Sequence, residues 1–245
     1  MNRALWLALV LLFAVNCAKH TARQVDVTAN ANQSSWSGSW TTAPTNGESA
    51  KETQREMETP AEFREVDFKN FSYPDSYGDK DIRLKDGEYE LADREVAGGY
   101  TVNFQGVDFV DLTGDGRTEA VVRLFGVLCG GSCDGGSHLI YIYTKPRRTL
   151  RLLWHIQTGS LAYGCGLKSL TVKKRFITLE GFGDCRLARG ELTAANELGK
   201  FEVEEFTKFD FEFADGKLAF KKRESFPSPL RDVRGYEPNI NISDD

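Results

Sequence analysis

Hydrophobic and polar residues alternate with a period of two at many places within residues 61–222, and this pattern predicts β-strands. Residues 209–213 (FDFEF) alternate strictly, which gives one apolar and one polar face. The dipeptide Asp215-Gly216 follows, and such pairs supply the positive φ angles of a tight turn. We therefore expect a hairpin that returns through Leu218.

Other segments extend this prediction. Residues 82–91 indicate a hairpin around Asp86-Gly87, and residues 170–179 indicate another around a basic turn. Residues 139–143 (LIYIY) are apolar at every position, which is typical of a central strand buried on both faces. The next strand is expected to present a single inward face, formed by Leu150, Leu152, Trp154 and Ile156.

The repeat of 3.6 residues that is typical of helices is not sustained anywhere, and only residues 187–198 are expected to hold a short helix. About 160 residues suffice for one self-sufficient core. The sequence thus predicts a mainly β fold for residues 61–222, a single antiparallel β domain (a sandwich or an open, barrel-like sheet) with little helix. Residues 223–245 contain three prolines and are expected to form a loosely ordered tail.

The N-terminus has the pattern of an export signal. Arg3 precedes an uncharged apolar run over residues 4–15, which ends shortly before Cys17. Twelve helical residues rise only ~18 Å, too little for the ~30 Å hydrocarbon core of a membrane. Residues 14–17 (AVNC) resemble the lipidation site of bacterial lipoproteins, although that family has Leu at the first position and a small residue at the third. Residues 1–17 are therefore expected to be a signal peptide with lipidation at Cys17. The alternative is an ordinary cleaved signal peptide with an incidental cysteine.

Residues 18–60 are expected to be a flexible tether. Within residues 28–47, 13 of 20 residues are Ser, Thr, Asn or Gly. Such a segment buries too little apolar area to offset the entropy lost on ordering. A lipidated chain would therefore be anchored to a membrane through its lipid alone, on a stalk, facing the periplasm or the cell exterior.

The four remaining cysteines are expected to form two disulfides, because an exported chain meets an oxidising compartment. Cys165 and Cys185 lie almost symmetrically about the turn at residues 174–175, so they are expected to face each other across the open end of that hairpin. Cys129 and Cys133 would then close a small loop. The other two pairings remain alternatives.

One loop carries candidate metal ligands. Residues with oxygen-bearing side chains at alternate positions, followed by a glycine, are typical of a loop around a calcium ion. Here these residues are Asp111, Thr113 and Asp115, and the glycine is Gly116. The backbone carbonyl of Arg117 and the carboxylate of Glu119 are expected to complete the set of ligands. An apolar strand follows instead of a helix, so the loop is not an EF-hand. The alternative is a plain turn, because Asp and Gly also favour tight connections.

This loop resembles the calcium loops of FG-GAP and VCBS repeats, whose pattern is Asp-x-Asp-Gly-Asp-Gly-x-x-Asp before an apolar strand. Asp111, Asp115 and Glu119 match that pattern, whereas Thr113 replaces an acidic or amide residue and removes a charge. Together with residues 66–74 (VDFKNFSYP) and 84–90 (LKDGEYE), the loop is also similar to a group of uncharacterised exported bacterial proteins. That resemblance implies an extracytoplasmic location and no particular activity.

The net charge and the absence of catalytic motifs limit the classes of function that we expect. The formal net charge of −5 argues against nucleic acid as a partner. The chain contains three histidines and no recognisable catalytic motif, so we expect a protein that is not an enzyme. The leading hypothesis is a non-catalytic binding or envelope-scaffold module whose partner is an envelope protein or glycan. The alternatives are an inhibitor of an extracellular hydrolase, such as lysozyme or a protease, and a cell-wall hydrolase that uses unidentified Asp or Glu residues.

Overall fold

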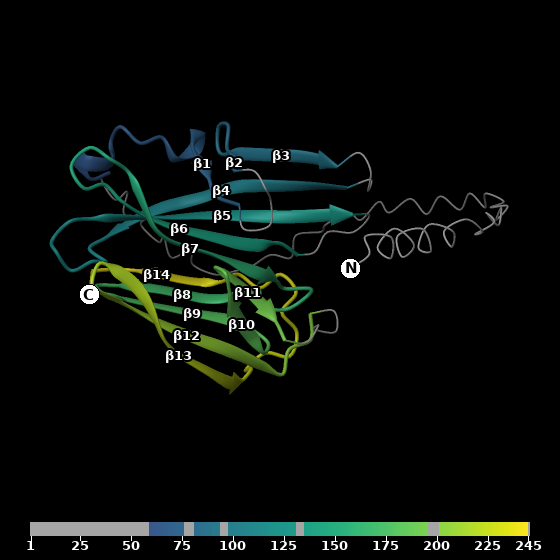
Figure 1. Cartoon of the computed structure of the whole chain (residues 1–245). Helices are drawn as coiled ribbons and strands as arrows, with labels where there is room; N and C mark the ends of the chain where they lie inside the picture. Colours follow the sequence, from purple (N-terminus) through teal and green to yellow (C-terminus); the bar gives the residue numbers. More distant parts are fainter. Residues whose placement is uncertain (1–58, 76–80, 94–97, 131–134, 196–200, 245) are drawn as a thin grey trace, which may run out of the picture. The chain divides into compact units, whose positions relative to one another are not determined.

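The computed structural model describes residues 59–75, 81–93, 98–130, 135–195 and 201–244. Figure 1 shows that their strands form two large layers, a seven-stranded and a five-stranded sheet, with a two-stranded ribbon beside them. The two large sheets pack face to face as a β-sandwich and neither closes into a barrel. The prediction of a mainly β, mostly antiparallel domain with little helix is confirmed. No helix within these residues is long and apolar enough to cross a membrane.

The seven-stranded sheet is the larger of the two layers. In spatial order its strands are β10 (Cys185–Ala188), β11 (Glu191–Ala194), β7 (Arg151–Ser160), β6 (Ser137–Thr144), β5 (Glu119–Gly130), β4 (Gly98–Val110) and β3 (Glu88–Asp93). Neighbouring strands are antiparallel except β11 and β7, which pair in parallel through Glu191 and Gln157. As predicted, β6 lies in the interior of the sheet.

The five-stranded sheet is built around two of the predicted hairpins. Its order is β13 (Lys217–Pro227), β12 (Glu205–Ala214), β9 (Phe176–Phe182), β8 (Leu167–Lys173) and β14 (Asn239–Ile242). Asp215 and Gly216 have φ angles of 53° and 76° in the turn between β12 and β13. The β8–β9 hairpin turns at residues 174–175.

The interior of the sandwich is the larger hydrophobic core. Val121, Ile140 and Ile156 of the seven-stranded sheet meet Leu170 and Phe209 of the five-stranded sheet there. All five side chains are at most 1% exposed. This burial of apolar surface from two layers is the main force holding the sheets together.

The opposite, outer face of the seven-stranded sheet is covered in part by the N-terminal segment. This segment, residues 59–85, contains two short 3-10 turns, η1 (Ala61–Phe63) and η2 (Phe68–Asn70), and the ribbon of β1 (Ser72–Tyr73) and β2 (Ile82–Arg83). Phe63, Phe68 and Tyr73 pack on Tyr141 and Leu124 in a second core. Strand β6 is therefore buried on both faces, which explains why residues 139–143 are uniformly apolar.

Two local predictions were wrong, each because of backbone geometry. Residues 150–156 do not share one inward face. Leu152 opposes Tyr143 and Trp154 opposes Ile142, so Leu153 is an extra residue, a β-bulge that switches the face of the strand. Residues 187–194 do not form a helix, because Arg189 and Gly190, with φ angles of 51° and 87°, make a tight turn between β10 and β11.

Two other segments differ from expectation in their pairing. Asp86 and Gly87 do form a tight turn, but only one bridge, Lys85–Glu88, joins its two sides. Strand β2 pairs with β1, and β3 pairs with β4. The segment after residue 223, expected to be a loose tail, continues β13 and then adds β14 in parallel beside β8.

Candidate functional site

A groove with a volume of about 560 Å³ lies on the outer face of the seven-stranded sheet, beside the N-terminal cover. Strands β3, β4, β5, β6, β7 and β11 all contribute to its walls, and Asp75 of the N-terminal segment also lines it. A volume of this size is in the range of pockets that hold a small organic ligand. The sequence did not predict this groove.

Glycines hollow the floor of the groove. The ring of Tyr100 lies over Gly126, where a Cβ atom would come within 2.7 Å of the Tyr100 hydroxyl. At Gly159 a Cβ atom would lie only 2.0 Å from the carbonyl oxygen of Gly164. Glycine inside a strand often marks such a close approach of another group. These two positions would therefore have been the available sequence signal for the groove.

The rim of the groove exposes apolar side chains. Leu91, Leu128 and Tyr163 are 54%, 58% and 61% exposed. Leu91 lies opposite Tyr100, and Tyr100 lies opposite Leu128. Leu91, Tyr100 and Leu128 therefore form one row across three adjacent strands. Apolar groups gathered in this way around a cavity are typical of a binding site rather than of an inert surface.

The side chain of Gln157 places a buried hydrogen-bond acceptor in the floor. Gln157 is 2% exposed, and its Oε1 accepts no hydrogen bond from any described residue. The backbone N–H of Gln157 is satisfied, because it donates to the carbonyl of Gly190 at 2.9 Å. Buried acceptors are nearly always satisfied in folded proteins. Gln157 Oε1 is therefore an acceptor that no described residue uses.

The charged side chain in the described lining of the groove is acidic. Among the described residues that line it, Asp75 carries a carboxylate and none is Lys, Arg or His. Glu191 lies next to Gln157 in the β11–β7 pair. Burial raises the pKa of Glu191, the charge of Asp75 raises it further, and Arg189 acts in the opposite direction. The described lining of the groove thus contains one carboxylate, that of Asp75, together with the hydroxyl groups of Ser137, Ser160 and Thr193.

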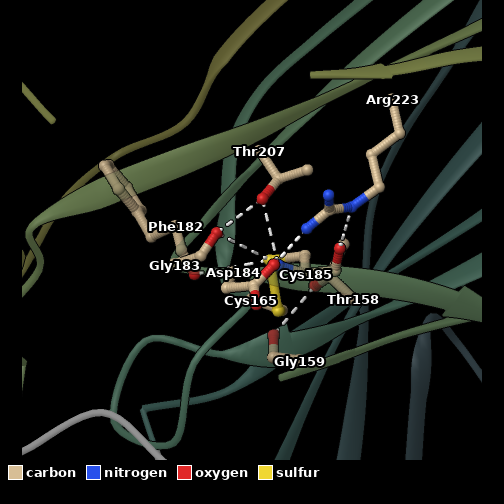
Figure 2. The surroundings of a disulfide bond; sticks show 9 residues. All are labelled: Thr158, Gly159, Cys165, Phe182, Gly183, Asp184, Cys185, Thr207 and Arg223. Carbon is tan, nitrogen blue, oxygen red and sulfur yellow. Dashed lines mark hydrogen bonds and ion pairs between the residues drawn. A yellow bond between two sulfur atoms is a disulfide. The ribbon is translucent and has the colours of Figure 1, made fainter. Parts of the chain in front are cut away.

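A disulfide supports the turn behind the groove (Figure 2). Cys165 and Cys185 are bonded with a Cα–Cα distance of 5.6 Å, which confirms the predicted pairing. Thr207 accepts a hydrogen bond from the backbone N–H of Cys185 at 3.0 Å and donates one to the carbonyl of Gly183 at 2.7 Å. Arg223 donates to the carbonyl of Cys185 at 2.8 Å. A Cβ atom at Gly159 would lie 3.1 Å from the Cβ atom of Cys165, so the disulfide lies directly behind the floor.

The other predicted cysteine sites are only partly within the described residues. Cys129 is disulfide-bonded, while its predicted partner, Cys133, lies outside the described residues. Cys17, the predicted lipidation site, lies outside them as well, as do the signal peptide and the tether up to residue 58.

The predicted calcium loop lies between β4 and β5, at the end of β5 opposite the groove. Asp111 begins it, and its two carboxylate oxygens accept hydrogen bonds from the backbone N–H groups of Gly114 (2.8 Å) and Gly116 (3.1 Å). The ammonium of Lys174 lies 3.5 Å from Asp111 Oδ2. The backbone N–H of Asp111 donates to Asp244 Oδ1 at 2.8 Å. The first predicted ligand therefore already has three partners for its carboxylate.

The carboxylates later in the loop also accept hydrogen bonds. Asp115 Oδ1 accepts hydrogen bonds from the Thr113 hydroxyl (3.0 Å) and from the backbone N–H of Arg117 (2.9 Å). Glu119 is 1% exposed and accepts from the backbone N–H of Thr113 at 3.0 Å and from the Thr144 hydroxyl at 3.1 Å. Burial raises the pKa of Glu119, and these two hydrogen bonds oppose the rise.

These hydrogen bonds use carboxylate oxygens that would otherwise be available to bind calcium. The carboxylate oxygens of Asp111, Asp115 and Glu119 accept hydrogen bonds from backbone N–H groups of the loop itself. The described residues include no group of three or more His, Cys, Asp or Glu placed to hold a metal ion. A hard cation needs six or more oxygen ligands around it. The loop as it stands does not fit the ion, and calcium binding stays a prediction.

A second cleft, of about 460 Å³, contains a buried histidine. The ring of His138 lies 5.0 Å from that of Phe125, between centroids. Burial lowers the pKa of His138 to about 4, so the imidazole is neutral near pH 7. No described side chain forms a hydrogen bond with this imidazole, and Arg234 and Glu237 also line the cleft.

Comparisons with known proteins add no relative. No family model matches the chain, and no curated protein or solved structure matches it either.

Proposed function

We propose that the chain is an exported, lipid-anchored, non-catalytic binding module, and that the groove on the seven-stranded sheet is its binding site. The observation that carries this proposal is the combination of an exposed apolar row with a buried acceptor that lacks a donor. Leu91 and Leu128 expose apolar surface to water at the rim, and Gln157 keeps an unused acceptor at the floor. A ligand with an apolar body and a hydrogen-bond donor satisfies both.

Export is supported by two independent features. The first is the N-terminal pattern of Arg3, an apolar run and Cys17, which is typical of a lipoprotein signal. The second is the disulfide between Cys165 and Cys185, because such bonds persist in oxidising compartments and are rare in the cytosol. The ligand or partner is then a component of the cell envelope, either an envelope protein or a glycan carrying an apolar group.

Binding at the groove is tested with the neutral apolar dye N-phenyl-1-naphthylamine, whose fluorescence rises on leaving water. The purified full-length protein is titrated in detergent-free buffer. Leu128→Glu places a charge on the apolar row and is expected to weaken dye binding at least tenfold. Phe176→Glu is the matched control, because Phe176 is 54% exposed on the other sheet and is expected to leave binding unchanged. Equal loss in both variants, or no dye binding to the native chain, would overturn the proposal.

A second candidate is an inhibitor of an extracellular hydrolase. It is favoured by the disulfide at Cys129, because a loop closed by a disulfide is a rigid element that can occupy the active site of an enzyme. Inhibition assays with lysozyme and a panel of secreted proteases test it. Inhibition that is lost in Cys129→Ser but kept in Leu128→Glu would assign the function to this loop instead of the groove.

A further inference from the structure

We propose that the groove binds a neutral glycolipid, with the alkyl chain on the row of Leu91, Tyr100 and Leu128 and the sugar head on the polar side chains of β6, β7 and β11. This inference rests on the proposed function, because it names the chemical class of ligand for the same groove. Two features define the class, an alkyl chain and a head that carries several hydroxyl groups and no charge.

Strand pairing divides the groove into an apolar and a polar half. Leu91, Tyr100 and Leu128 oppose one another in register on β3, β4 and β5. On the neighbouring strands, Ser137 of β6 opposes Ser160 of β7. The lining therefore changes from apolar side chains to hydroxyl groups between β5 and β6. An elongated ligand with one apolar and one polar end matches this division, and its alkyl chain gains from the burial of apolar surface.

The polar half carries uncharged side chains on three adjacent strands. Ser137 belongs to β6, Gln157 and Ser160 belong to β7, and Thr193 belongs to β11. Each hydroxyl group and the amide can both donate and accept hydrogen bonds. Strand β7 lies between β6 and β11, and neighbouring strands are about 4.8 Å apart, so these groups spread over about 10 Å. A sugar ring with several hydroxyl groups spans such a patch, whereas a single hydroxyl group contacts only part of it.

Gln157 places an amide at the floor of this polar half. The residue is 2% exposed and lines the groove, and its Oε1 atom accepts no hydrogen bond from the described residues. The amide presents an acceptor and a donor side by side, so a head group that both donates and accepts satisfies it completely. Sugar hydroxyl groups do both, whereas an ammonium group only donates and a carboxylate only accepts.

The described lining favours an uncharged head over a charged one. None of the described residues that line the groove is Lys, Arg or His, so an anionic head would lose its water without gaining a counterion. Asp75 also lines the groove, but it already has a partner within the chain, so the proposed head contacts do not include it. The other polar side chains of the described lining are neutral. A neutral sugar hydrogen-bonds with them without the cost of burying a charge.

The test compares four ligands that share an octyl chain, n-octyl β-D-glucoside, 1-octanol, n-octylamine and sodium octanoate, each below the concentration at which it forms micelles. Displacement of N-phenyl-1-naphthylamine from the full-length protein is measured near pH 7. Burial of the alkyl chain alone would favour octanol, because the sugar makes the glucoside more soluble in water. Recognition of the head is expected to reverse this order. The glucoside is expected to displace the dye at a concentration at least threefold lower than octanol, and at least tenfold lower than octylamine or octanoate.

Two variants assign the selectivity to the named groups. Gln157→Leu and Ser137→Ala are each expected to reduce the preference for the glucoside over octanol at least threefold, with displacement by octanol unchanged, because the apolar row stays in place. Ser225→Ala, in β13 of the other sheet, is the matched control for Ser137→Ala and is expected to keep the full preference. Gln157→Leu replaces a buried amide by an apolar side chain of similar size, and Ser137→Ala removes one oxygen atom, so both variants are expected to fold.

The outcomes separate this inference from the proposed function. If octanol displaces the dye at a lower concentration than the glucoside, or if octylamine or octanoate does, the selection of a sugar head is wrong while the groove remains an apolar binding site. If the glucoside is preferred and neither Gln157→Leu nor Ser137→Ala changes the preference, the assignment of the head to these side chains is wrong. If neither the dye nor any ligand binds, both proposals are wrong.

Discussion

The rings of Tyr73 and Tyr141 lie 4.9 Å apart between centroids, one from the N-terminal segment and one from the interior strand β6. The Tyr73 hydroxyl donates a hydrogen bond to the carbonyl of Phe68 at 2.6 Å, and the Tyr141 hydroxyl donates one to the carbonyl of Pro74 at 2.7 Å. Both hydroxyls are thereby satisfied inside a core. The contact makes the N-terminal segment a structural part of the domain, and it positions Asp75 at the groove.

Removal of this contact is expected to destabilise the whole domain. Tyr73 is fully buried, so Tyr73→Ala removes a large aromatic side chain from a packed core and is expected to cost about 3–5 kcal/mol. Urea unfolding followed by tryptophan fluorescence measures the change. Tyr163→Ala, at a position 61% exposed, is the control and is expected to change stability by no more than about 0.5 kcal/mol. A loss below about 1 kcal/mol in Tyr73→Ala would mean that the N-terminal segment is only loosely attached.

The disulfide between Cys165 and Cys185 is expected to matter for both stability and binding. It joins residues separated by 20 positions, and removal of such a crosslink costs about 3 kcal/mol through the greater entropy of the unfolded chain. The double variant Cys165→Ala/Cys185→Ala is compared with the native chain by urea unfolding. Because Cys165 lies behind Gly159 in the floor of the groove, the variant is also expected to bind N-phenyl-1-naphthylamine more weakly under conditions where it remains folded. Unchanged dye binding would show that the floor keeps its shape without the crosslink.

The raised pKa of Glu119 leads us to expect a specific dependence of the folding stability on pH. Burial raises its pKa in the folded protein above the ordinary value of 4.5, so the folded state favours the protonated form. This carboxyl therefore opposes folding increasingly as the pH rises from about 4.5 through the folded-state pKa, and each unit of the rise corresponds to about 1.4 kcal/mol.

The variant Glu119→Gln tests this dependence, because an amide keeps an acceptor for the Thr113 N–H and a donor for the Thr144 hydroxyl. We expect the stability of Glu119→Gln relative to the native chain to increase between pH 4.5 and pH 7.5 and then to level off. Denaturant midpoints across this range measure it. Glu90→Gln, on the exposed side of β3, is the control and is expected to show no such trend. A native chain that gains on the variant as the pH rises would contradict the assignment.

The sequence predicts the architecture well where one strand carries one clear pattern. The alternation at residues 209–213 gave β12 and its turn, and the near-symmetry of Cys165 and Cys185 gave the disulfide. Both depend on contacts between residues close in the chain. The pattern at residues 150–156 misled, because the bulge at Leu153 shifts the register and only the pairing with β6 reveals it.

The groove could not be predicted from the sequence for the same reason. Leu91, Leu128 and Gln157 are far apart in the chain, and each has an unremarkable local pattern. They meet because β3, β5 and β7 are brought side by side by pairing through other strands. The unpaired acceptor of Gln157 is likewise a property of the assembled sheet. The glycines at positions 126 and 159 are the sequence signal that could have indicated a close approach to these strands, although the sequence-based prediction of the fold did not use it.

Calcium binding to the loop after β4 remains to be measured, and Lys174 provides the sharpest way to do so. Its ammonium lies 3.5 Å from Asp111 Oδ2, close to where a cation would compete for that carboxylate. If the loop binds calcium, the ion must displace Lys174 and rearrange the hydrogen bonds of Asp111. The melting temperature is therefore expected to rise more with calcium in Lys174→Met than in the native chain, with the disulfides intact in both.

A ligand present at about 100 times its Kd adds about 2.7 kcal/mol of stability, which corresponds to roughly 5–11 °C for a domain of this size. The comparison is made in millimolar Ca²⁺ and then in chelator. Addition of Asp115→Asn to the Lys174→Met variant is expected to abolish the rise, because it removes one of the three carboxylates. Lys145→Met, which removes a lysine from another turn of the sandwich, is the matched control and is expected to behave as the native chain does. The absence of a calcium-dependent shift in both the native chain and Lys174→Met would establish the loop as a turn stabilised by its own hydrogen bonds.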